Sequence, residues 1–547
     1  MRPLVSFVLS CAFLGMGGAA RAAEPPPLGG RAMEWAATLG SGAVATAEKR
    51  DGRWTFALGG QPFPQGHAAV APERVLFEIG SISKVFTGAL LAQASLEGKV
   101  GLDDPLAKRL PVRFSHPETG AITLRQLATH TSCLPRLPDN LMDPSGADPY
   151  AAYDRRALFE YLGGAKLAER APCEASYSNL GFGILGVVLE VAYDKPWSEL
   201  VREKITGPLG MADTVQALSP EQQTRFADPW AGKERAHPWT FQAIAGAGAL
   251  RSTLADLAKF ADALLAGTKG PLGPAWPILS GDHADWPAVG GKIGLALVHT
   301  RVHGEETYSH EGATAGYASA LHLLPEKGRA AIVLASNGQA NPLAWLAAWW
   351  APSAPAASRA RVTLPAELLD EYVGVYSIDK ATRFTLIRKG DGLVARLTGQ
   401  PFIPLFASAK DELFYEVVDA QLSLRRDAAG KVAGLTLHQN GRDVPAVRDS
   451  VEVPHVEFPA AAALAEYAGT YDFGAYRPGA TIEVNVRGDV LTAQLTDQPA
   501  FPVFASGRDR FDYDVVEATL TFERDTAGKI VALTLHQNGL DLRSPKR

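Results

Sequence analysis

The sequence predicts a mixed domain of strands and helices followed by two small antiparallel β domains. Strand-like and helical patterns alternate from about Trp35 to Trp350, with glycine-rich turns between them. Residues 351–364 are small, proline-bearing and basic, which is typical of a linker. Beyond this linker the chain contains an internal duplication, and its 547 residues are enough for two to four domains of roughly 100–200 residues each.

The composition is that of an ordinary globular protein, and it excludes several function classes. Hydrophobic residues make up 46% of the chain, which is enough for more than one core. Lys and Arg total 53 against 59 Asp and Glu, so there is no basic surplus for a polyanion and we predict no nucleic-acid partner. Three cysteines exclude a disulfide-stapled scaffold, and the scattered histidines lack metal-ligand spacing. We therefore predict neither a metal site nor a cofactor.

The first residues have the pattern of an export signal. Arg2 precedes an apolar run from Leu4 to Met16, and small residues follow as far as Ala22. This pattern predicts a secretory signal peptide over residues 1–22, cleaved near Ala22. The run is too short to span a bilayer, and no later segment reaches about 18 uninterrupted apolar residues, so no transmembrane anchor is predicted. The mature chain is expected to be periplasmic or secreted.

The duplication consists of one copy over residues 365–448 and another over residues 459–547. EYVGVY (371–376) returns as EYAGTY (466–471), GQPFIPLFAS (399–408) as DQPAFPVFAS (497–506), and LTLHQNG occurs at 435–441 and 533–539. Between these anchors, short runs alternate with period two and closely spaced turns follow, which predicts antiparallel meanders. Each copy is long enough for a small closed barrel, whereas two long copies are too few for a solenoid. We expect the repeated histidines, His438 and His536, to stabilise turns.

The first catalytic candidate is Ser81, in the segment FEIGSISK (77–84) before an apolar helix-forming run. Ser81 is therefore expected at or near a helix N-terminus, where unpaired N–H groups and the helix dipole favour a developing negative charge. Lys84 lies one turn later on the same face. An amine so close to a hydroxyl can accept its proton once desolvation and neighbouring charge lower its pKa. On its own this spacing is also compatible with an exposed serine and a solvated lysine on a surface helix.

Tyr177 and Asn179 stand just before a small-residue apolar helix at 180–186. We interpret Tyr177 as sharing the role of general base. Asn179 is interpreted as a bridge between Lys84 and a substrate amide oxygen.

A third segment comprises His310, Glu311, Gly312 and Ala313, followed by a strand-like run over residues 316–324. We expect this run to line a cleft. Gly312 would allow the substrate to approach the backbone closely.

In this order and at these spacings, the three segments resemble the penicillin-recognising serine hydrolases, specifically the class C β-lactamase-like branch. Further matching stretches are LRQLATHTS (124–132), PLGM (208–211) and GALRSTLADL (248–257). The resemblance covers roughly residues 30–350 and implies an α+β fold, with an antiparallel sheet flanked by helices. A domain of this kind followed by two lipocalin-like β domains resembles the bacterial D-aminopeptidases, in which the last barrel sends a loop toward the active site. The alternative for the repeats is a wall- or partner-binding module.

The resemblance implies an acyl-enzyme mechanism. Ser81 would be the acylated nucleophile, and Lys84 with Tyr177 would carry out the proton transfers. The backbone N–H groups of Ser81 and Ala313 would form the oxyanion hole.

The chain departs from the β-lactamase pattern at the third segment. His310-Glu311-Gly312 stands where Lys-Thr-Gly usually holds the β-lactam carboxylate. A histidine-first version is found in some DD-peptidases and D-aminopeptidases of the superfamily. Glu311, where it faces the cleft, would repel an anionic substrate and favour an amine; the alternative is a solvent-facing strand residue.

We interpret the protein as an exported serine hydrolase that forms an acyl-enzyme on Ser81 and hydrolyses D-alanyl-type peptide amides or β-lactams. Its expected partner is a small-molecule or peptide substrate, including one derived from peptidoglycan. One alternative is a D-aminopeptidase or carboxylesterase of the same superfamily. Another is a non-catalytic penicillin- or wall-binding protein, although a pure binder would not need Ser81, Lys84 and Tyr177 together.

Cys133 and Cys173 are predicted to form a disulfide. Relatives usually carry glycine at both positions, and both departures here fall on cysteine. Removal of the signal peptide leaves them as the only cysteines, in an oxidising compartment. The bridge would tether the loop carrying Arg136 and Asn140 beside the active site; the alternative is two unpaired thiols.

Overall fold

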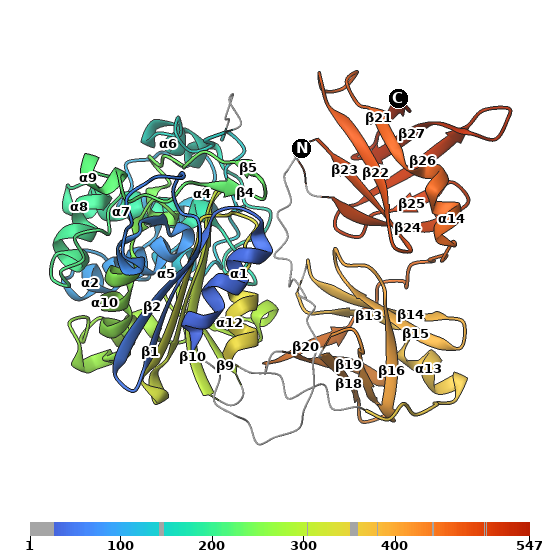
Figure 1. Ribbon diagram of the computed structural model, residues 1–547, viewed down its shortest axis with the longest axis horizontal. Helices are drawn as coiled ribbons and strands as arrows, with labels where there is room; N and C mark the ends of the chain where they lie inside the picture. The colour runs from blue at the N-terminus through green and yellow to red at the C-terminus, as the bar shows by residue number, and fades with distance from the viewer. Residues whose placement is uncertain are drawn as a thin grey trace. The chain divides into compact units, whose positions relative to one another are not determined.

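The computed structural model describes residues 27–141, 147–302, 305–350, 359–379, 381–418, 420–439, 442–496, 498 and 500–547, with the backbone alone at 347–350. The predicted signal peptide over residues 1–22 and the first part of the predicted linker, 351–358, lie outside these residues. The chain divides into two compact units, which consist mainly of residues 18–354 and 355–547 (Figure 1).

The N-terminal unit is built around an eight-stranded antiparallel sheet with the order β2-β1-β12-β11-β10-β9-β8-β7. The strands are β1 (Ala43–Arg50), β2 (Arg53–Gly60), β7 (Ala284–Trp286), β8 (Gly291–Ile293), β9 (Val298–Val302), β10 (Glu305–Ala313), β11 (Ala318–Leu324) and β12 (Arg329–Ala335). β1 pairs with β12 so that Val44 lies opposite Ala335. The beginning and the end of this unit therefore share one sheet.

Helices cover both faces of the sheet. α1 (Arg31–Leu39) and α12 (Pro342–Trp350) lie together on one face (Figure 1), where Trp35 stacks on Trp345 with ring centroids 5.1 Å apart. The other face packs against a larger core that contains α2 (Ser83–Leu96), α7 (Asn179–Tyr193) and α10 (Leu254–Leu265). The prediction of an α+β domain with an antiparallel sheet flanked by helices is confirmed.

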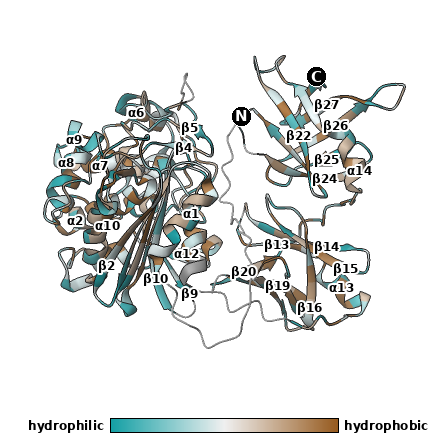
Figure 2. Cartoon of the chain, viewed as in Figure 1, coloured by the Kyte–Doolittle hydropathy of each residue, from teal (hydrophilic) through white to brown (hydrophobic). Residues whose placement is uncertain are grey.

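The remaining short elements of this unit connect the core helices to the sheet. They are α3 (Leu106–Arg109), α4 (Pro117–Gly120), α5 (Leu124–Ala128), α6 (Arg155–Gly164), α8 (Trp197–Val201), α9 (Pro220–Gln223), α11 (Trp276–Ser280), β3 (Phe77–Glu78), β4 (Trp230–Ala231), β5 (Glu234–Arg235) and β6 (Arg251–Ser252). Figure 2 shows the hydrophobic colour concentrated in the central strands and the hydrophilic colour on outer helices such as α9. Within the described residues, no helix combines the length and the apolar character needed to cross a membrane.

Glycines bring α7 unusually close to a one-turn helix, η5 (Ala245–Ala247). A Cβ atom on Gly183 would lie 3.0 Å from Ile244, and one on Gly246 would lie 2.6 Å from the Phe182 carbonyl oxygen. Any larger residue at position 246 would push η5 away from α7, because packed interiors have no space for an added methyl group. This contact fixes the position of the Ala247 carbonyl, which accepts a hydrogen bond of 2.7 Å from Lys84 Nζ.

The C-terminal unit contains two β domains of similar construction. The first is a closed barrel made of β13 (Gly374–Ser377), β14 (Arg383–Lys389), β15 (Gly392–Leu397), β16 (Ile403–Ala409), β17 (Glu412–Phe414), β18 (Ala420–Arg426), β19 (Val432–Gln439) and β20 (Arg442–Arg448). The second is an eight-stranded sheet made of β21 (Gly469–Asp472), β22 (Thr481–Arg487), β23 (Val490–Leu495), β24 (Phe501–Gly507), β25 (Arg510–Asp512), β26 (Ala518–Arg524), β27 (Ile530–Gln537) and β28 (Leu540–Pro545). Its ends meet at a bridge between Tyr471 and Lys546, and the short helices α13 (Ala366–Tyr372) and α14 (Ala461–Leu464) precede the two domains. The prediction of two small antiparallel barrel domains is confirmed.

The residues before each β domain make the same contact with it. Val362, in the predicted linker, donates a backbone hydrogen bond of 2.8 Å to Ala407, and Glu457 donates one of 2.8 Å to Ala505. The repeated histidines also have equivalent partners, since His438 lies 2.6 Å from Asp443 and His536 lies 2.7 Å from Asp541. Both pairs join neighbouring strands at a hairpin, as expected for residues that stabilise turns.

Each β domain presents a phenylalanine and a carboxylate that bind an arginine from elsewhere in the chain. In the second copy, Arg396 lies 3.9 Å above the ring of Phe504 and 3.5 Å from the carboxylate of Asp514. Arg396 belongs to the first copy, so this buried pair joins the two copies. The equivalent site in the first copy consists of Phe406 and Glu416, and the exposed Arg361 occupies it.

Candidate active site

Ser81 lies at the entrance of the buried helix α2. It occupies the middle of a 3-10 turn, η3 (Gly80–Ile82), that runs directly into α2. This agrees with the prediction of a serine near a helix N-terminus. Gly80 has a φ of +48°, and a Cβ there would lie 2.7 Å from the backbone nitrogen of Ala313, so only glycine fits without displacing the backbone.

Lys84 is fully buried one turn after Ser81, and its amine lies within hydrogen-bond distance of three protein groups. Its Nζ lies 2.9 Å from Ser81 Oγ, 2.8 Å from Asn179 Oδ1 and 2.7 Å from the Ala247 carbonyl oxygen. Burial, and then the nearby positive charge of Arg136, hold the pKa of Lys84 well below its usual range.

Tyr177 and Asn179 reach the same point from the start of α7. The Ser178 side chain caps this helix, since its Oγ accepts a hydrogen bond of 3.0 Å from Gly181 N. The Tyr177 hydroxyl is hydrogen-bonded to Ser81, and Lys84 Nζ lies 4.7 Å from the centre of the Tyr177 ring. Burial raises the pKa of Tyr177, against smaller opposing effects of the Ser81 hydrogen bond and of Arg136.

The histidine of LATHTS, His130, holds the segment that carries Tyr177. Its backbone carbonyl accepts a 2.8 Å hydrogen bond from Ser176 N, and its Nδ1 accepts one of 3.0 Å from Ser178 N. The imidazole also packs on the Tyr177 ring with centroids 4.5 Å apart. Burial keeps the pKa of His130 far below its ordinary value, so the ring is neutral and its Nδ1 can accept this hydrogen bond.

The third predicted segment, His310 to Ala313, forms the end of β10 and lies against η3. A Cβ on Gly312 would lie 2.0 Å from the Ile79 carbonyl oxygen, which explains the glycine there. His310 is buried, and desolvation lowers its pKa to about 3. Glu311 is partly buried, and desolvation raises its pKa to about 7.

The structure thus brings the predicted residues from all three segments together. It also places three further groups beside them, for which the sequence predicts no contact with Lys84 or Tyr177: the Ala247 carbonyl, the ring of His130 and the guanidinium of Arg136. The Arg136 guanidinium lies 5.0 Å from the centre of the Tyr177 ring. The motif that contains His130 belongs to the family resemblance, but nothing local in the sequence indicates which ring atom accepts a hydrogen bond.

Cys133 and Cys173 are paired in the structure, with Cα atoms 5.4 Å apart. Cys173 N also donates a hydrogen bond of 2.9 Å to the Thr131 carbonyl oxygen, so a backbone contact joins the two loops beside the bridge. The pair closes a loop of 40 residues that includes Arg136 and Asn140.

We predict that the unreduced, denatured mature protein contains no titratable thiol. Replacing both cysteines by serine is expected to lower the free energy of unfolding by about 4 kcal/mol, because the closed loop restricts the unfolded chain. Thiol titration and urea unfolding test these points. Two reactive thiols per chain would contradict the disulfide.

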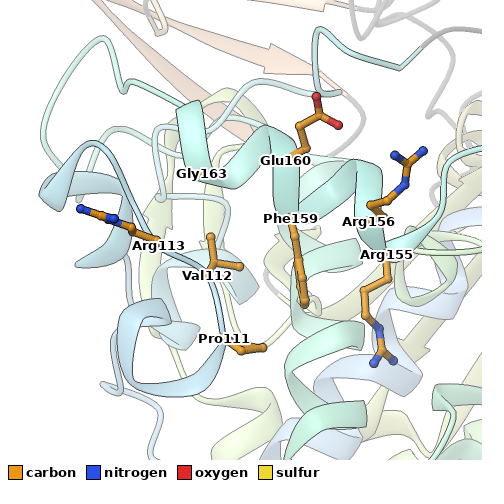
Figure 3. A pocket seen from close by; sticks show the side chains of 8 residues that line it. All are labelled: Pro111, Val112, Arg113, Arg155, Arg156, Phe159, Glu160 and Gly163. Atoms are coloured by element: carbon orange, nitrogen blue, oxygen red, sulfur yellow. The ribbon is translucent and has the colours of Figure 1, made fainter.

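Other parts of the N-terminal unit offer less for chemistry. Among the residues that the structure describes, no cluster of three or more His, Cys, Asp or Glu side chains is suited to a metal ion. A surface hollow near α6 contains none of the predicted site residues (Figure 3). It is lined by Pro111, Val112, Arg113, Arg155, Arg156, Phe159, Glu160 and Gly163.

Comparison with known proteins agrees with this geometry. The chain is 37% identical over 187 residues to the D-alanyl-D-alanine-carboxypeptidase/endopeptidase AmpH of Escherichia coli K12, which covers 33% of this chain and 47% of that protein. It therefore spans about half the length of this curated relative. It is 23% identical over 411 residues to penicillin-binding protein 4* of Bacillus subtilis, covering 68% of this chain and 87% of that protein.

The solved structures support the same fold. A β-lactamase/D-alanine carboxypeptidase from Yersinia pestis matches with a TM-score of 0.50 and 22% sequence identity, over 57% of this chain and 92% of that chain. Residues 358–448 and 454–544 each match a domain of unknown function, DUF3471, which agrees with the duplication. Residues 37–351 match the Beta-lactamase family. Because this match covers more than half of its residues, the chain belongs to the Beta-lactamase family.

Proposed function

We propose that the protein is an exported serine hydrolase that works through an acyl-enzyme on Ser81. The observation that carries the proposal is the contact between Lys84 and Ser81, 2.9 Å apart, with the Tyr177 hydroxyl on the same serine. The two proton-transferring groups and the nucleophile thus come from separate segments and meet at one hydroxyl. The signal-peptide pattern of residues 1–22 supports export.

The surroundings of Lys84 fit a neutral amine. A neutral amine has two N–H donors and one lone pair, and Lys84 has two carbonyl acceptors, Asn179 Oδ1 and Ala247 O, besides the Ser81 hydroxyl. The lone pair is therefore left for the Ser81 proton. In this mechanism Lys84 takes that proton as Ser81 Oγ attacks the substrate carbonyl, and Tyr177 passes a proton to the leaving group.

The developing oxyanion has two candidate donors. The Ala313 nitrogen lies beside Gly80, directly before Ser81, so the backbone N–H groups of Ser81 and Ala313 belong to one small region. We assign the oxyanion hole to these two groups, since preorganised backbone donors stabilise the tetrahedral intermediate.

The substrates we propose are D-alanyl-type peptide amides or β-lactams. The relatives named as carboxypeptidases and penicillin-binding proteins support this class. A second candidate is an aminopeptidase acting on D-amino acid peptides, and the observation that favours it is Glu311 in place of the usual threonine of the third motif. Asn179 is assigned to the substrate amide, as its side-chain oxygen is already oriented by Lys84.

Mass spectrometry after incubation with a fluorophosphonate and, separately, with benzylpenicillin tests the proposal. Labelling of Ser81 by the fluorophosphonate alone is expected for an aminopeptidase or esterase. A stable penicilloyl adduct on Ser81 is expected for a DD-peptidase. Failure of both reagents to modify Ser81 would contradict the proposed function and favour a binding protein.

The pKa of Glu311, raised to about 7, gives a pH-dependent prediction. The carboxyl is neutral below pH 7 and negative above it, so attraction for a substrate amine grows as the pH rises. Between pH 5.5 and 7.5 the ratio of kcat/KM for D-alanyl 4-nitroanilide to that for its N-acetyl derivative is expected to increase on the order of tenfold, ~1.4 kcal/mol. Glu311→Gln should make the ratio independent of pH; an equal increase in this variant would show that Glu311 does not face the substrate.

We also expect His130 to position Tyr177 rather than to react. His130→Phe keeps a ring beside Tyr177 but leaves the buried Ser178 N–H without an acceptor, which costs about 1–3 kcal/mol. His130→Asn is the matched control, because its side-chain oxygen supplies an acceptor and asparagine tolerates the φ of +60° at this position. The phenylalanine variant should lose at least about tenfold in kcat with little change in KM, with partial recovery in the asparagine variant. Equal losses in both variants would contradict a role for Nδ1.

A further inference from the structure

We propose that Arg136 binds a carboxylate on the part of the substrate that lies along α7, and that it thereby sets the charge preference of the active site. The proposal rests on the serine hydrolase function proposed above and names a feature of its substrates. Three observations carry it: no carboxylate among the described residues is paired with Arg136, its backbone is rigidly supported, and the third motif begins with histidine instead of lysine.

The Arg136 guanidinium is half-buried beside the catalytic centre, over the ring of Tyr177. Over the described stretches, 27–141 and 147 onward with their later gaps, no carboxylate forms an ion pair with it. A partly desolvated cation costs free energy unless an anion pairs with it. When a guanidinium lies over an aromatic ring, its N–H groups still point outward in its own plane, where they match the two oxygens of a carboxylate.

The backbone of Arg136 is fixed, as expected for a residue that selects a ligand. Its carbonyl oxygen accepts hydrogen bonds from Asn179 N, at 3.0 Å, and from Leu180 N, at 3.2 Å. Ser178 Oγ also donates to the Pro135 carbonyl oxygen at 2.7 Å, and the pairing of Cys133 with Cys173 holds the same loop. Arg136 is therefore attached directly to the first turn of α7, next to Asn179.

Lys84, the other basic side chain at the centre, has a different role. Lys84 Nζ makes its hydrogen bonds to Ser81, Asn179 and Ala247, and its lowered pKa suits a neutral base rather than an anion receptor. The third motif begins with His310, whose pKa of about 3 leaves it uncharged. A substrate carboxylate on the α7 side thus finds its charge partner in Arg136.

The test compares two 4-nitrophenyl esters that share the same glutaryl chain and end either in a carboxylate or in its neutral methyl ester: mono-4-nitrophenyl glutarate and 4-nitrophenyl methyl glutarate. The ratio of their kcat/KM values is the readout. Because both esters acylate Ser81 through the same Lys84, an effect of Arg136 on the pKa of Lys84 cancels in the ratio. We expect the wild-type protein to favour the glutarate by at least tenfold at low ionic strength, and to lose part of this preference in 0.5 M salt.

Arg136→Gln is expected to bring the ratio to near 1, and Arg136→Lys to retain part of the preference, since lysine keeps the charge but not the planar fork. The matched control is Arg156→Gln, which removes an exposed arginine of α6 from a hollow that none of the catalytic residues line (Figure 3). It should keep the wild-type ratio.

A wild-type ratio near 1, or a ratio that Arg136→Gln leaves unchanged, would overturn the proposal for Arg136 while leaving the hydrolase intact. If neither ester is turned over and the fluorophosphonate does not label Ser81, the proposed function itself fails, and the proposal for Arg136 fails with it.

Discussion

Replacement of Ser81 by alanine is expected to abolish turnover of every ester and amide substrate, by at least about 10³-fold in kcat, while the protein stays folded. The acyl-enzyme needs the hydroxyl that Lys84 and Tyr177 both contact, and alanine offers no atom to acylate. Steady-state kinetics with the 4-nitrophenyl esters measure the loss of turnover. Intact-protein mass spectrometry measures the loss of acylation. Circular dichroism checks the fold, and Ser81→Cys is a useful companion because it restores a nucleophile. More than a tenth of the wild-type activity in the alanine variant would remove Ser81 from its role.

Replacement of Lys84 by alanine is expected to be nearly as severe. It removes the base and leaves Asn179 Oδ1 and the Ala247 carbonyl oxygen without their shared donor. Lys84→Met fills the same volume without an amine, so its comparison with alanine separates the loss of the base from the loss of packing.

The double variant Ser81→Ala/Lys84→Ala should lose little more activity than Ser81→Ala alone, since residues that act as one unit are not additive. Labelling of Ser81 by the fluorophosphonate in the Lys84 variants gives a second readout, and we expect it to slow by at least about 100-fold. Labelling at the wild-type rate in Lys84→Met would contradict the assignment of Lys84 as the base.

The sequence predicted the placement of Ser81 and Lys84 because one helical turn decides it. Three residues along a helix bring two side chains to the same face, and a preceding glycine marks the start of the helix. The duplication likewise predicted two β domains, since each anchor segment recurs at nearly constant separation. Local periodicity is sufficient for both inferences.

Contacts between segments that are distant in the sequence could not be predicted as well. The run at 316–324 was expected to line a cleft, but every residue of β11 is buried, because helices cover both faces of the sheet. Ala247 contacts Lys84 through its backbone carbonyl, and a backbone group cannot be recognised from the residue type. The close glycine contact between α7 and η5 brings this carbonyl to the site. Arg136 was expected near the site from its loop, but its position over Tyr177 depends on how that loop meets α7.

The arginine that joins the two β domains also records how the duplicated copies have diverged. Both copies keep the receiving face, Phe406 with Glu416 in the first and Phe504 with Asp514 in the second. The position equivalent to Arg396 is the exposed Gln494 in the second copy. The joint between the two copies is therefore directional: the first copy supplies the cation, and the second copy supplies the ring and the carboxylate that receive it.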